Sequence, residues 1–290
     1  MDKKGLLYLV ATPIGNLEDI SLRALRILKE VDLIAAEDTR QILKLLNRYD
    51  IKKPVTSYYE HNKANKGSLI ISELLKGRNI ALVSDAGSPG ISDPGQELVK
   101  LAIENGIIVT MVPGPIAAIM GLVLSGLSTD RFVFEGFLPV NKNIRKERIL
   151  SLKSEIRTVI FYEAPHKLVR TLKELFSLLG ERKIALAREL TKKFEDIARC
   201  TLSEAIEKYE TEAPRGEFVL VLEGASEKDI LTEKARKWSD VSIEEHVGIY
   251  TEQGSDKKEA MKKVAEERGI TRREVYKILT RESALKKLKT

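Results

Sequence analysis

Cysteine and histidine are scarce in this chain of 290 residues. Cys200 is the single cysteine, and only three histidines are present. One cysteine cannot form an internal disulfide, and no group of Cys and His residues has the spacing of a zinc site. The sequence therefore predicts a protein of a reducing, cytoplasmic compartment without a structural metal.

A secretory signal and an uninterrupted membrane span are also missing. The apolar run after Lys3-Lys4 ends at Thr12-Pro13, which is too short for a signal peptide. Residues 106–129 carry no charge and are long enough to cross a membrane, but Pro113-Gly114-Pro115 divides them. We therefore expect a buried strand, a ligand loop and a buried helix there, and no membrane partner.

Three familiar ligand-binding motifs do not occur. The loop after the first predicted strand has only Gly15, so the dinucleotide pattern G-x-G-x-x-G is missing. There is no P-loop, because Lys66-Gly67-Ser68 has the wrong order, and no G-x-S-x-G elbow. These absences disfavour ordinary dinucleotide enzymes, P-loop phosphotransferases and α/β-hydrolases. What remains is a ligand held mainly by backbone groups and turns, which suits a zwitterionic nucleoside better than a polyphosphate.

The residues that are present predict alternating strands and helices in the first half of the chain. Apolar runs predict strands at Leu6–Ala11, Leu33–Ala36, Val55–Tyr58, Ile80–Ser84 and Ile107–Val112. Amphipathic segments predict helices near Ser21–Glu30, Arg40–Tyr49, Asn65–Lys76, Gly95–Asn105 and Ile116–Ser125. Repeated strand–helix units predict a mainly parallel sheet covered on both faces, with the carboxyl ends of its strands along one edge.

A second α/β region and a helical tail follow. Strands are predicted at Phe132–Glu135, Thr158–Tyr162, Ile184–Ala187, Ile197–Thr201 and Phe218–Glu223, and helices at Ile144–Lys153, His166–Leu179 and Ser203–Tyr209. The strand at Ile197 alternates like a half-exposed antiparallel strand, whereas the one at Phe218 is uniformly apolar like a central strand. We therefore predict a mixed second sheet. The expected division is an N-terminal α/β domain at 1–115, a second α/β domain at 116–225 and a helical tail at 226–290.

The tail has the pattern of a helix-turn-helix with a positive excess. Capping boxes at Ser242-Ile243-Glu244-Glu245 and Thr271-Arg272-Arg273-Glu274 each open a helix, and a helix between them ends before Gly269. The last helix carries four basic residues, with Tyr276 among them: Arg272, Arg273, Lys277 and Arg281. These residues form either the solvated face of a small bundle or a surface that contacts nucleic-acid phosphates, and we favour the second interpretation.

The loop at Ser84–Gly95 is the most unusual segment of the chain. It packs three glycines, two prolines, three serines and two aspartates into twelve residues directly after a predicted buried strand. Such a sequence can continue neither a strand nor a helix. It predicts a rigid loop, rich in backbone polar groups, at the edge of the sheet where open α/β sheets bind ligands.

Many ordered motifs together resemble one family. They are Leu7–Asp19, Ala36–Arg40, Glu60–Asn62, Val83–Gly95, Pro113–Pro115, Asp130–Phe132, Glu135–Pro139, Phe161–His166 and Ala187–Lys192. From about Gly5 to Gly224 the chain resembles the ribosomal RNA small-subunit methyltransferase I family, within the tetrapyrrole (class III) methylase superfamily. Three positions depart from the expected pattern: Ile116 replaces a serine, Gly90 a leucine and Tyr59 a histidine.

The resemblance implies a fold, an activity and a cofactor. It implies two α/β domains of the tetrapyrrole methylase type, with a parallel N-terminal sheet and a mixed second sheet, and a homodimer. It implies S-adenosylmethionine-dependent methylation of the ribose 2′-oxygen of a cytidine in 16S rRNA, at the decoding centre of the small ribosomal subunit. It places the cofactor against Ala11, Pro13, Ser84, Asp85, Gly87, Ser88, Pro113, Gly114, Pro115, Ile116, Ala164 and Pro165.

Methyl transfer to a hydroxyl needs alignment and a way to remove a proton. The candidates for this catalytic work are Glu37, Asp38, Arg40 and His61, with Glu163 as a further possible base. Structural alternatives stand beside three of them: Glu37 and Asp38 pair with Arg40 or cap the next helix, and His61 anchors its loop. We expect His166 to cap the helix after Pro165. The enzyme could also rely on positioning alone.

Two rival functions stay open on the sequence. One is another methylase of the same superfamily, acting on a tetrapyrrole or a protein side chain. The other is a non-catalytic RNA chaperone or regulator that binds through the tail. The basic tail argues against the first, and the elaborate loops at the sheet edge argue against the second.

Overall fold

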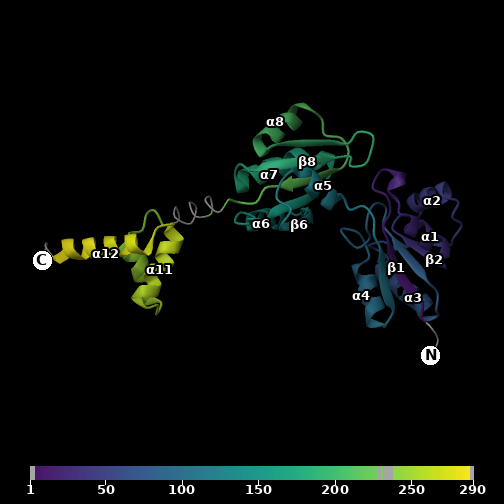
Figure 1. Ribbon diagram of the computed structural model, residues 1–290, viewed down its shortest axis with the longest axis horizontal. Coiled ribbons are helices and arrows are strands. Elements are labelled where there is room, and N and C mark those ends of the chain that lie inside the picture. Colours follow the sequence, from purple (N-terminus) through teal and green to yellow (C-terminus); the bar gives the residue numbers. More distant parts are fainter. Residues whose placement is uncertain (1–3, 227–229, 231–237, 288–290) are drawn as a thin grey trace. The chain divides into compact units, whose positions relative to one another are not determined.

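The structure is a computed structural model that describes residues 4–226, 230 and 238–287, except for the side chains of Ala64 and 281–287. Its contacts divide the chain into two compact units (Figure 1). The first comprises Met1–Leu150 with Thr158–Glu223, and the second comprises Ser151–Arg157 with Gly224–Thr290. Because both sheets belong to the first unit, the predicted boundary between residues 115 and 116 stays a prediction.

The N-terminal sheet is entirely parallel, as expected. Its strands are β1 (Leu6–Val10), β2 (Leu33–Ala36), β3 (Val55–Ser57), β4 (Ile80–Val83) and β5 (Ile108–Val112), in the order β3-β2-β4-β1-β5. Strand β4 is central, and β1 lies between it and β5. Strand β1 pairs with β4 through Leu7 and Ile80, and with the edge strand β5 through Leu7 and Val109. The carboxyl ends of all five strands therefore lie at one edge.

Helices cover both faces of this sheet, because successive strand residues point to opposite sides. They are α1 (Leu22–Glu30), α2 (Thr39–Arg48), α3 (Lys63–Leu75) and α4 (Gln96–Glu104). On one face Ala81 and Val83 pack with Leu28 of α1 and Leu46 of α2. On the other face, the neighbouring residues Ile80 and Leu82 pack with side chains from α3 and α4, namely Ile70, Leu74, Leu98 and Ala102.

The second sheet is mixed, which confirms the expected fold class. Its strands are β6 (Phe132–Phe137), β7 (Thr158–Glu163), β8 (Lys183–Arg188), β9 (Asp196–Thr201) and β10 (Phe218–Leu222), in the order β6-β7-β10-β8-β9. Strands β6 and β7 are parallel, and β10 runs antiparallel between β7 and β8. The fully buried β10 is central and the half-exposed β9 is an edge strand, as the sequence predicts.

The helices of this half are α5 (Ala117–Ser125), α6 (Lys142–Ser151), α7 (Leu168–Leu179) and α8 (Leu202–Thr211). Helix α5 covers one face of the sheet, where Ala118 and Leu122 pack against Val219 and Val221. The charge-free stretch 106–129 folds as β5, a loop and α5, as expected, but the expected burial is wrong in part. Because β5 is an edge strand, Ile108 is 66% exposed, and Val123 of α5 is 64% exposed. No helix in the described part of the chain is long and apolar enough to cross a membrane.

The second unit is a bundle of α10 (Ile243–Glu252), α11 (Lys257–Arg268) and α12 (Arg272–Lys287). The predicted capping boxes are both formed: Ser242 and Glu245 bond each other's backbone, as do Thr271 and Glu274. Helix α11 ends at Gly269, whose φ of 63° suits the short turn into α12. Val247, Val264 and Val275 form the bundle core.

Candidate functional site

The loops that follow β1 and β4 are joined into one rigid wall. Thr12 and Gly87 exchange two backbone hydrogen bonds, with N···O distances of 2.8 and 3.0 Å. The Ser84 hydroxyl donates to the Gly87 carbonyl at 3.0 Å, and the Thr12 hydroxyl donates to the Ser84 carbonyl at 3.1 Å. The special composition of Ser84–Gly95 thus builds a loop that is held by its own polar groups.

Two glycines in this wall are required by its geometry. Gly87 has φ +82°, and a Cβ there would lie 3.2 Å from Ile14 Cγ2. A Cβ on Gly114, in the loop after β5, would lie only 2.7 Å from the Cβ of Ala11. A side chain at Gly114 would therefore push the loops after β1 and β5 apart.

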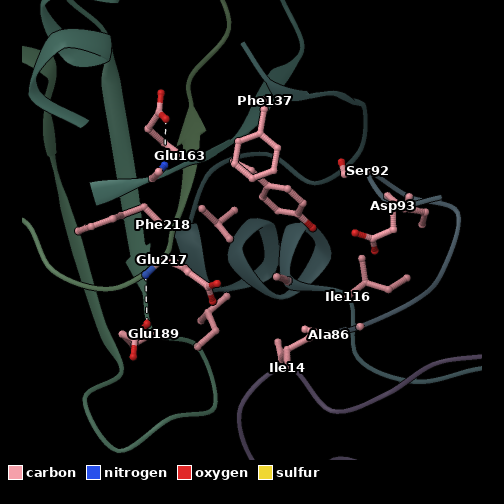
Figure 2. Close-up of a pocket in the computed structure, with 18 of the residues that line it drawn as sticks. Ile14, Ala86, Ser92, Asp93, Ile116, Phe137, Glu163, Glu189, Glu217 and Phe218 are labelled. Atoms are coloured by element: carbon pink, nitrogen blue, oxygen red, sulfur yellow. Dashed lines mark hydrogen bonds between the residues drawn. The ribbon is translucent and has the colours of Figure 1, made fainter. Parts of the chain in front are cut away.

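A cavity of about 450 Å³ opens beside this wall (Figure 2). Ile14 and the segment Ala86–Ser88 contribute from the first sheet. Phe137 at the end of β6 and Tyr162–Pro165 at the end of β7 contribute from the second. The carboxyl ends of β6, β7 and β8 share an edge with the amino end of the antiparallel β10, so Ala187 and Phe218 also reach the cavity.

The Ser88 hydroxyl in the cavity wall is buried and has no protein partner in the described part of the chain. Ser88 is 5% exposed, and its hydroxyl forms no hydrogen bond within the described residues. A buried hydroxyl without a partner is costly, and it points to a ligand that completes its bonding.

One side of the cavity is acidic. Asp93 lines it, and Glu37 and Asp85 lie near enough to act on Asp93 electrostatically. Burial, and then the charges of Glu37 and Asp85, raise the pKa of Asp93 to about 7. Burial, together with the charges of Asp85 and Asp38, also raises the pKa of Glu37. This side therefore attracts positive charge and can exchange protons near neutrality.

On the opposite side the charges are already paired. The Lys192 ammonium lies 3.1 Å from Glu189 Oε1 and 2.9 Å from Glu217 Oε2. Among the described residues that line the cavity, Lys192 is the one cation. Because it is neutralised, the wall offers no free positive charge to a phosphate.

The loop after β8, which carries Glu189 and Lys192, is strained and is hydrogen-bonded to the loop after β1. Glu189 and Thr191 have φ of 51° and 65°, which non-glycine residues rarely adopt. The Thr191 hydroxyl accepts a hydrogen bond from the Asn16 backbone at 3.1 Å. A Cβ on Gly15 would lie 2.4 Å from Lys192 Cγ, so the close contact between these two loops depends on a glycine there.

The predicted cofactor residues divide into a lining set and a supporting set. The cavity is lined by Gly87, Ser88, Ile116, Ala164 and Pro165. The others lie outside its lining, in the loops that hold these residues or next to them: Ala11, Pro13, Ser84, Asp85, Pro113, Gly114 and Pro115. Asp85 has a separate contact, since its carboxylate accepts the Asp38 backbone N–H at 2.9 Å.

Glu37, Asp38, Arg40 and His61, the four main catalytic candidates, all lie outside the cavity lining, whereas the further candidate Glu163 lies within it. Asp38 caps α2 and forms an ion pair with Arg40 at 2.6 Å, which is the structural alternative that the sequence left open. Those bonds, chiefly the Arg40 side chain, lower the pKa of Asp38 to about 2. His61 is exposed in the turn before α3, edge-on to the Tyr59 ring. Glu37 alone of the four acts electrostatically on Asp93.

Glu163 is bonded to neighbouring protein groups, and His166 does not have the role that the sequence suggested for it. The Glu163 carboxylate turns away from the cavity in Figure 2 and bonds the Thr171 hydroxyl and the Ala164 backbone, with Arg145 3.8 Å away. The expectation that His166 caps a helix is wrong. Lys167 occupies the N-cap of α7, and no side chain caps it, because Pro165–Lys167 form a 3₁₀ turn instead.

Three of the residues that we expect to contact nucleic acid are exposed on α12. Arg272, Arg273 and Lys277 lie on its surface, near Tyr276, which is 60% exposed. None of these three forms an ion pair within the described residues. The Arg281 side chain lies outside the described residues.

Several residues of the wall are missing from the predicted set, namely Asp93, Tyr162, Glu189, Lys192 and Glu217. Asp93 is a carboxylate in the loop at Ser84–Gly95, which the sequence predicts to bind a ligand. Its residue type and position could therefore have identified it as a site residue. Glu217 directly precedes the antiparallel strand β10. Ligand sites are expected at the carboxyl ends of strands, so this position at an amino end was not predicted.

Comparison with known proteins gives the class of this fold and site. The family model "Tetrapyrrole (Corrin/Porphyrin) Methylases" matches residues 6–206. The solved uroporphyrin-III C-methyltransferase from Thermus thermophilus, complexed with S-adenosyl homocysteine, shares the fold with a TM-score of 0.53. It is 19% identical, and the match covers 75% of this chain and 97% of that one. The chain belongs to the tetrapyrrole methylase family and has its fold.

Curated relatives narrow the class. The ribosomal RNA small subunit methyltransferase I of Halalkalibacterium halodurans is 49% identical over 97% of this chain and 96% of its own length. The protein of the same name from Bacillus subtilis is 49% identical over 94% of this chain and 93% of its own length. The chain belongs to the ribosomal RNA small subunit methyltransferase I family, and it is a methyltransferase.

Proposed function

We propose that this chain transfers the methyl group of S-adenosylmethionine to the ribose 2′-oxygen of a cytidine in 16S rRNA, at the decoding centre of the small ribosomal subunit. The observation that carries the proposal is the match to relatives named for rRNA methylation over 97% of the chain. The cavity supports it, because its composition suits such a cofactor. A cytoplasmic location follows from this substrate.

The cavity fits the cofactor through its backbone-rich wall and its charge. Ser88 supplies an unpaired buried hydroxyl, and Gly87, Ile116, Ala164 and Pro165 supply the surrounding surface. Lys192 is paired with Glu189 and Glu217, so the described part of the wall offers no free cation to a polyphosphate. When bound, S-adenosylmethionine supplies an activated methyl group, so the task of these residues is to hold and align the reactants.

We propose that the tail supplies RNA contacts. Arg272, Arg273 and Lys277 are exposed cations that form no ion pair among the described residues, and such groups bind phosphates in a salt-dependent way. The exposed Tyr276 ring offers a surface on which an unpaired base can stack. Arg281, predicted for the same surface, remains part of this proposal through its sequence position alone.

A homodimer is part of the same proposal. Helix α5 exposes Ile119 and Val123, which are one helical turn apart and 40% and 64% exposed. Ile108 on the edge strand β5 is 66% exposed. Exposed apolar side chains of this kind are typical of surfaces that a second subunit covers. Sedimentation of the purified chain at several concentrations measures the oligomeric state.

The direct test is transfer of labelled methyl. Small ribosomal subunits from cells that lack the modification are incubated with the purified chain and methyl-labelled S-adenosylmethionine. The expected result is label in 16S rRNA, with none in ribosomal protein. Absence of label in rRNA, in subunits and in naked 16S rRNA alike, contradicts the proposal.

A further inference from the structure

Asp93 is a carboxylate in the cavity wall that no protein group engages. Figure 2 shows it directed into the cavity, across from Glu189 and Glu217. Within the residues that the structure describes, no hydrogen bond or ion pair involves it. By contrast, Glu163 and Glu189 on the other walls are both bonded. Asp93 is thus the carboxylate of the wall that is available to a ligand.

The backbone around Asp93 is built to hold it in place. Ser92, the preceding residue, has φ +65°, in the region that non-glycine residues rarely adopt. The Ser92 hydroxyl lies close to Gly136 of β6, since a Cβ added to Gly136 would be 3.3 Å from it. At this point the pairing of β6 with β7 is irregular, between Phe134 and Gly136. Strain and an irregular strand at one point are typical of functional loops. The residue before Asp93 therefore lies close to β6 of the second sheet.

The neighbours of Asp93 set its charge state. Glu37 follows β2, Asp85 follows β4, and Tyr162 on β7 faces it from the second sheet. Burial and then the two carboxylates raise the pKa of Asp93 to about 7. The unpaired Ser88 hydroxyl in the same wall is an independent sign that a ligand completes this part of the cavity.

We propose that Asp93 accepts the proton of the ribose hydroxyl as that oxygen attacks the methyl carbon. The proposal rests on the function proposed above. The bond from the 2′-oxygen to the methyl carbon forms as the carbon–sulfur bond breaks. The electron pair of that bond stays on sulfur, which becomes a neutral thioether. The hydroxyl proton moves to the Asp93 carboxylate, which later releases it to water.

The other candidates are placed less well for this step. Asp38 is committed to Arg40 and to the helix cap, and His61 lies outside the cavity lining. Glu37 is also outside the lining, where it acts on Asp93 rather than on a ligand in the cavity. Glu37 is therefore a positioning residue in this scheme.

The test compares the Asp93→Asn variant with the wild type and with Glu104→Gln. Asparagine keeps the size of the side chain but cannot accept the proton. Glu104 is an exposed acid on α4, loosely paired with Lys100 at 3.9 Å, so its variant controls for the loss of one negative charge. Single-turnover methyl transfer to unmodified small subunits is measured from pH 6 to 9, and cofactor affinity is measured separately by calorimetry.

The wild-type rate is expected to rise about tenfold per pH unit below about 7 and to level off above it. The Asp93→Asn rate is expected to fall by about 100-fold or more at pH 8 and to lose this pH dependence. Its cofactor affinity should stay within about threefold of wild type, and Glu104→Gln should behave as wild type.

Three results overturn the assignment. The first is that Asp93→Asn transfers the methyl group at the same rate, and with the same dependence of that rate on pH, as the wild type. The second is a weaker cofactor affinity with an unchanged rate at saturation, which assigns Asp93 to cofactor binding. The third is no transfer to rRNA by the wild type itself, which refutes the proposed function and this step together.

Discussion

At the scale of single residues, Ser88 carries the clearest mark of a ligand. Its hydroxyl is buried without a partner in the wall of the cavity, while the hydroxyls of Ser84 and Thr12 nearby are all bonded. An unpaired buried hydroxyl costs stability in the free protein, so its presence is best explained by a bond that forms when the cavity fills.

Replacing Ser88 by alanine should therefore separate binding from stability. The variant should bind S-adenosylmethionine about 3- to 10-fold more weakly, since one hydrogen bond contributes about 1 kcal/mol. Its melting temperature without ligand should equal or exceed that of the wild type, because a costly group is removed. Calorimetric titration and a thermal melt measure the two effects.

Ser125→Ala is the matched control for this variant. The Ser125 hydroxyl is also buried, but it donates to the Leu122 carbonyl at 2.7 Å and accepts from Leu127. Its loss should lower the melting temperature and leave cofactor affinity unchanged. If Ser88→Ala binds the cofactor as tightly as Ser125→Ala does, the role given to Ser88 is wrong.

At the scale of elements, the cavity depends on how closely the loops after β1, β4 and β5 approach one another. The Thr12–Gly87 bridge joins two of these loops, and the contact of Gly114 with Ala11 joins the third. Parallel strands bring such loops to one edge, and small residues let the backbones come together there. The site is therefore a property of the sheet edge rather than of any single motif.

Gly114→Val tests this packing. Its Cβ would lie 2.7 Å from the Cβ of Ala11, a buried atom that cannot move aside. We expect a loss of about 1–3 kcal/mol in stability, as for other overpacked sites, and at least about a tenfold loss in cofactor affinity. Chemical denaturation and calorimetry report these changes.

Gly248→Ala provides the comparison for a glycine that packs against nothing. A Cβ there meets no atom within 4 Å, and the residue lies within helix α10. This variant should keep wild-type cofactor affinity and gain slightly in stability, since alanine favours helix. Equal cofactor affinity in Gly114→Val and Gly248→Ala would show that the close approach at Gly114 is not needed.

The elements were largely predictable, because their signals are local. The apolar runs at Leu6 and Ile80 end in loops of glycine and proline, and the observed strands β1 and β4 end within one residue of the predicted positions. Capping boxes likewise mark the starts of α10 and α12. Order within a sheet is not local, so the central place of β10 was readable only from its unbroken apolar character.

The site was predictable only in part, for the same reason. Gly87 and Ser88 lie in a loop of unusual composition, and the resemblance to the family implied the Ala164-Pro165 turn; all four residues line the cavity. Glu37, Asp38, Arg40 and His61 have suitable chemistry but do not line it. Which side chains converge depends on how the second sheet places Tyr162 and Glu217 opposite Asp93, and no spacing in the chain encodes that.

At the scale of the whole molecule, catalysis and RNA capture are assigned to different compact units. The cavity lies in the first unit, and the exposed cations of α12 lie in the second. If this division of labour holds, changes in α12 should alter RNA binding without altering cofactor binding.

Charge reversal on α12 tests the division. The variant Arg272→Glu, Arg273→Glu, Lys277→Glu should bind 16S rRNA fragments at least about tenfold more weakly. The slope of log affinity against log salt should fall by about 2, since each lost phosphate contact removes about 0.7. Cofactor affinity should match wild type. Filter binding at several salt concentrations measures the first two quantities.

The matched control reverses three lysines of α11 in the same unit, Lys257, Lys258 and Lys262. It changes the net charge by the same amount, on a different helix. A much smaller loss of RNA affinity is expected for it. Equal losses in the two triple variants would mean that net charge alone matters and that α12 has no special surface.

The most direct measurement of the central claim is the chemical identity of the methylated nucleoside. Methyl-labelled 16S rRNA from the transfer reaction is digested to nucleosides and resolved by chromatography with mass detection. The account predicts label in 2′-O-methylcytidine at one position, which also resists alkaline cleavage there. Label in a base-methylated nucleoside, or in tetrapyrrole or protein but not in rRNA, would contradict it.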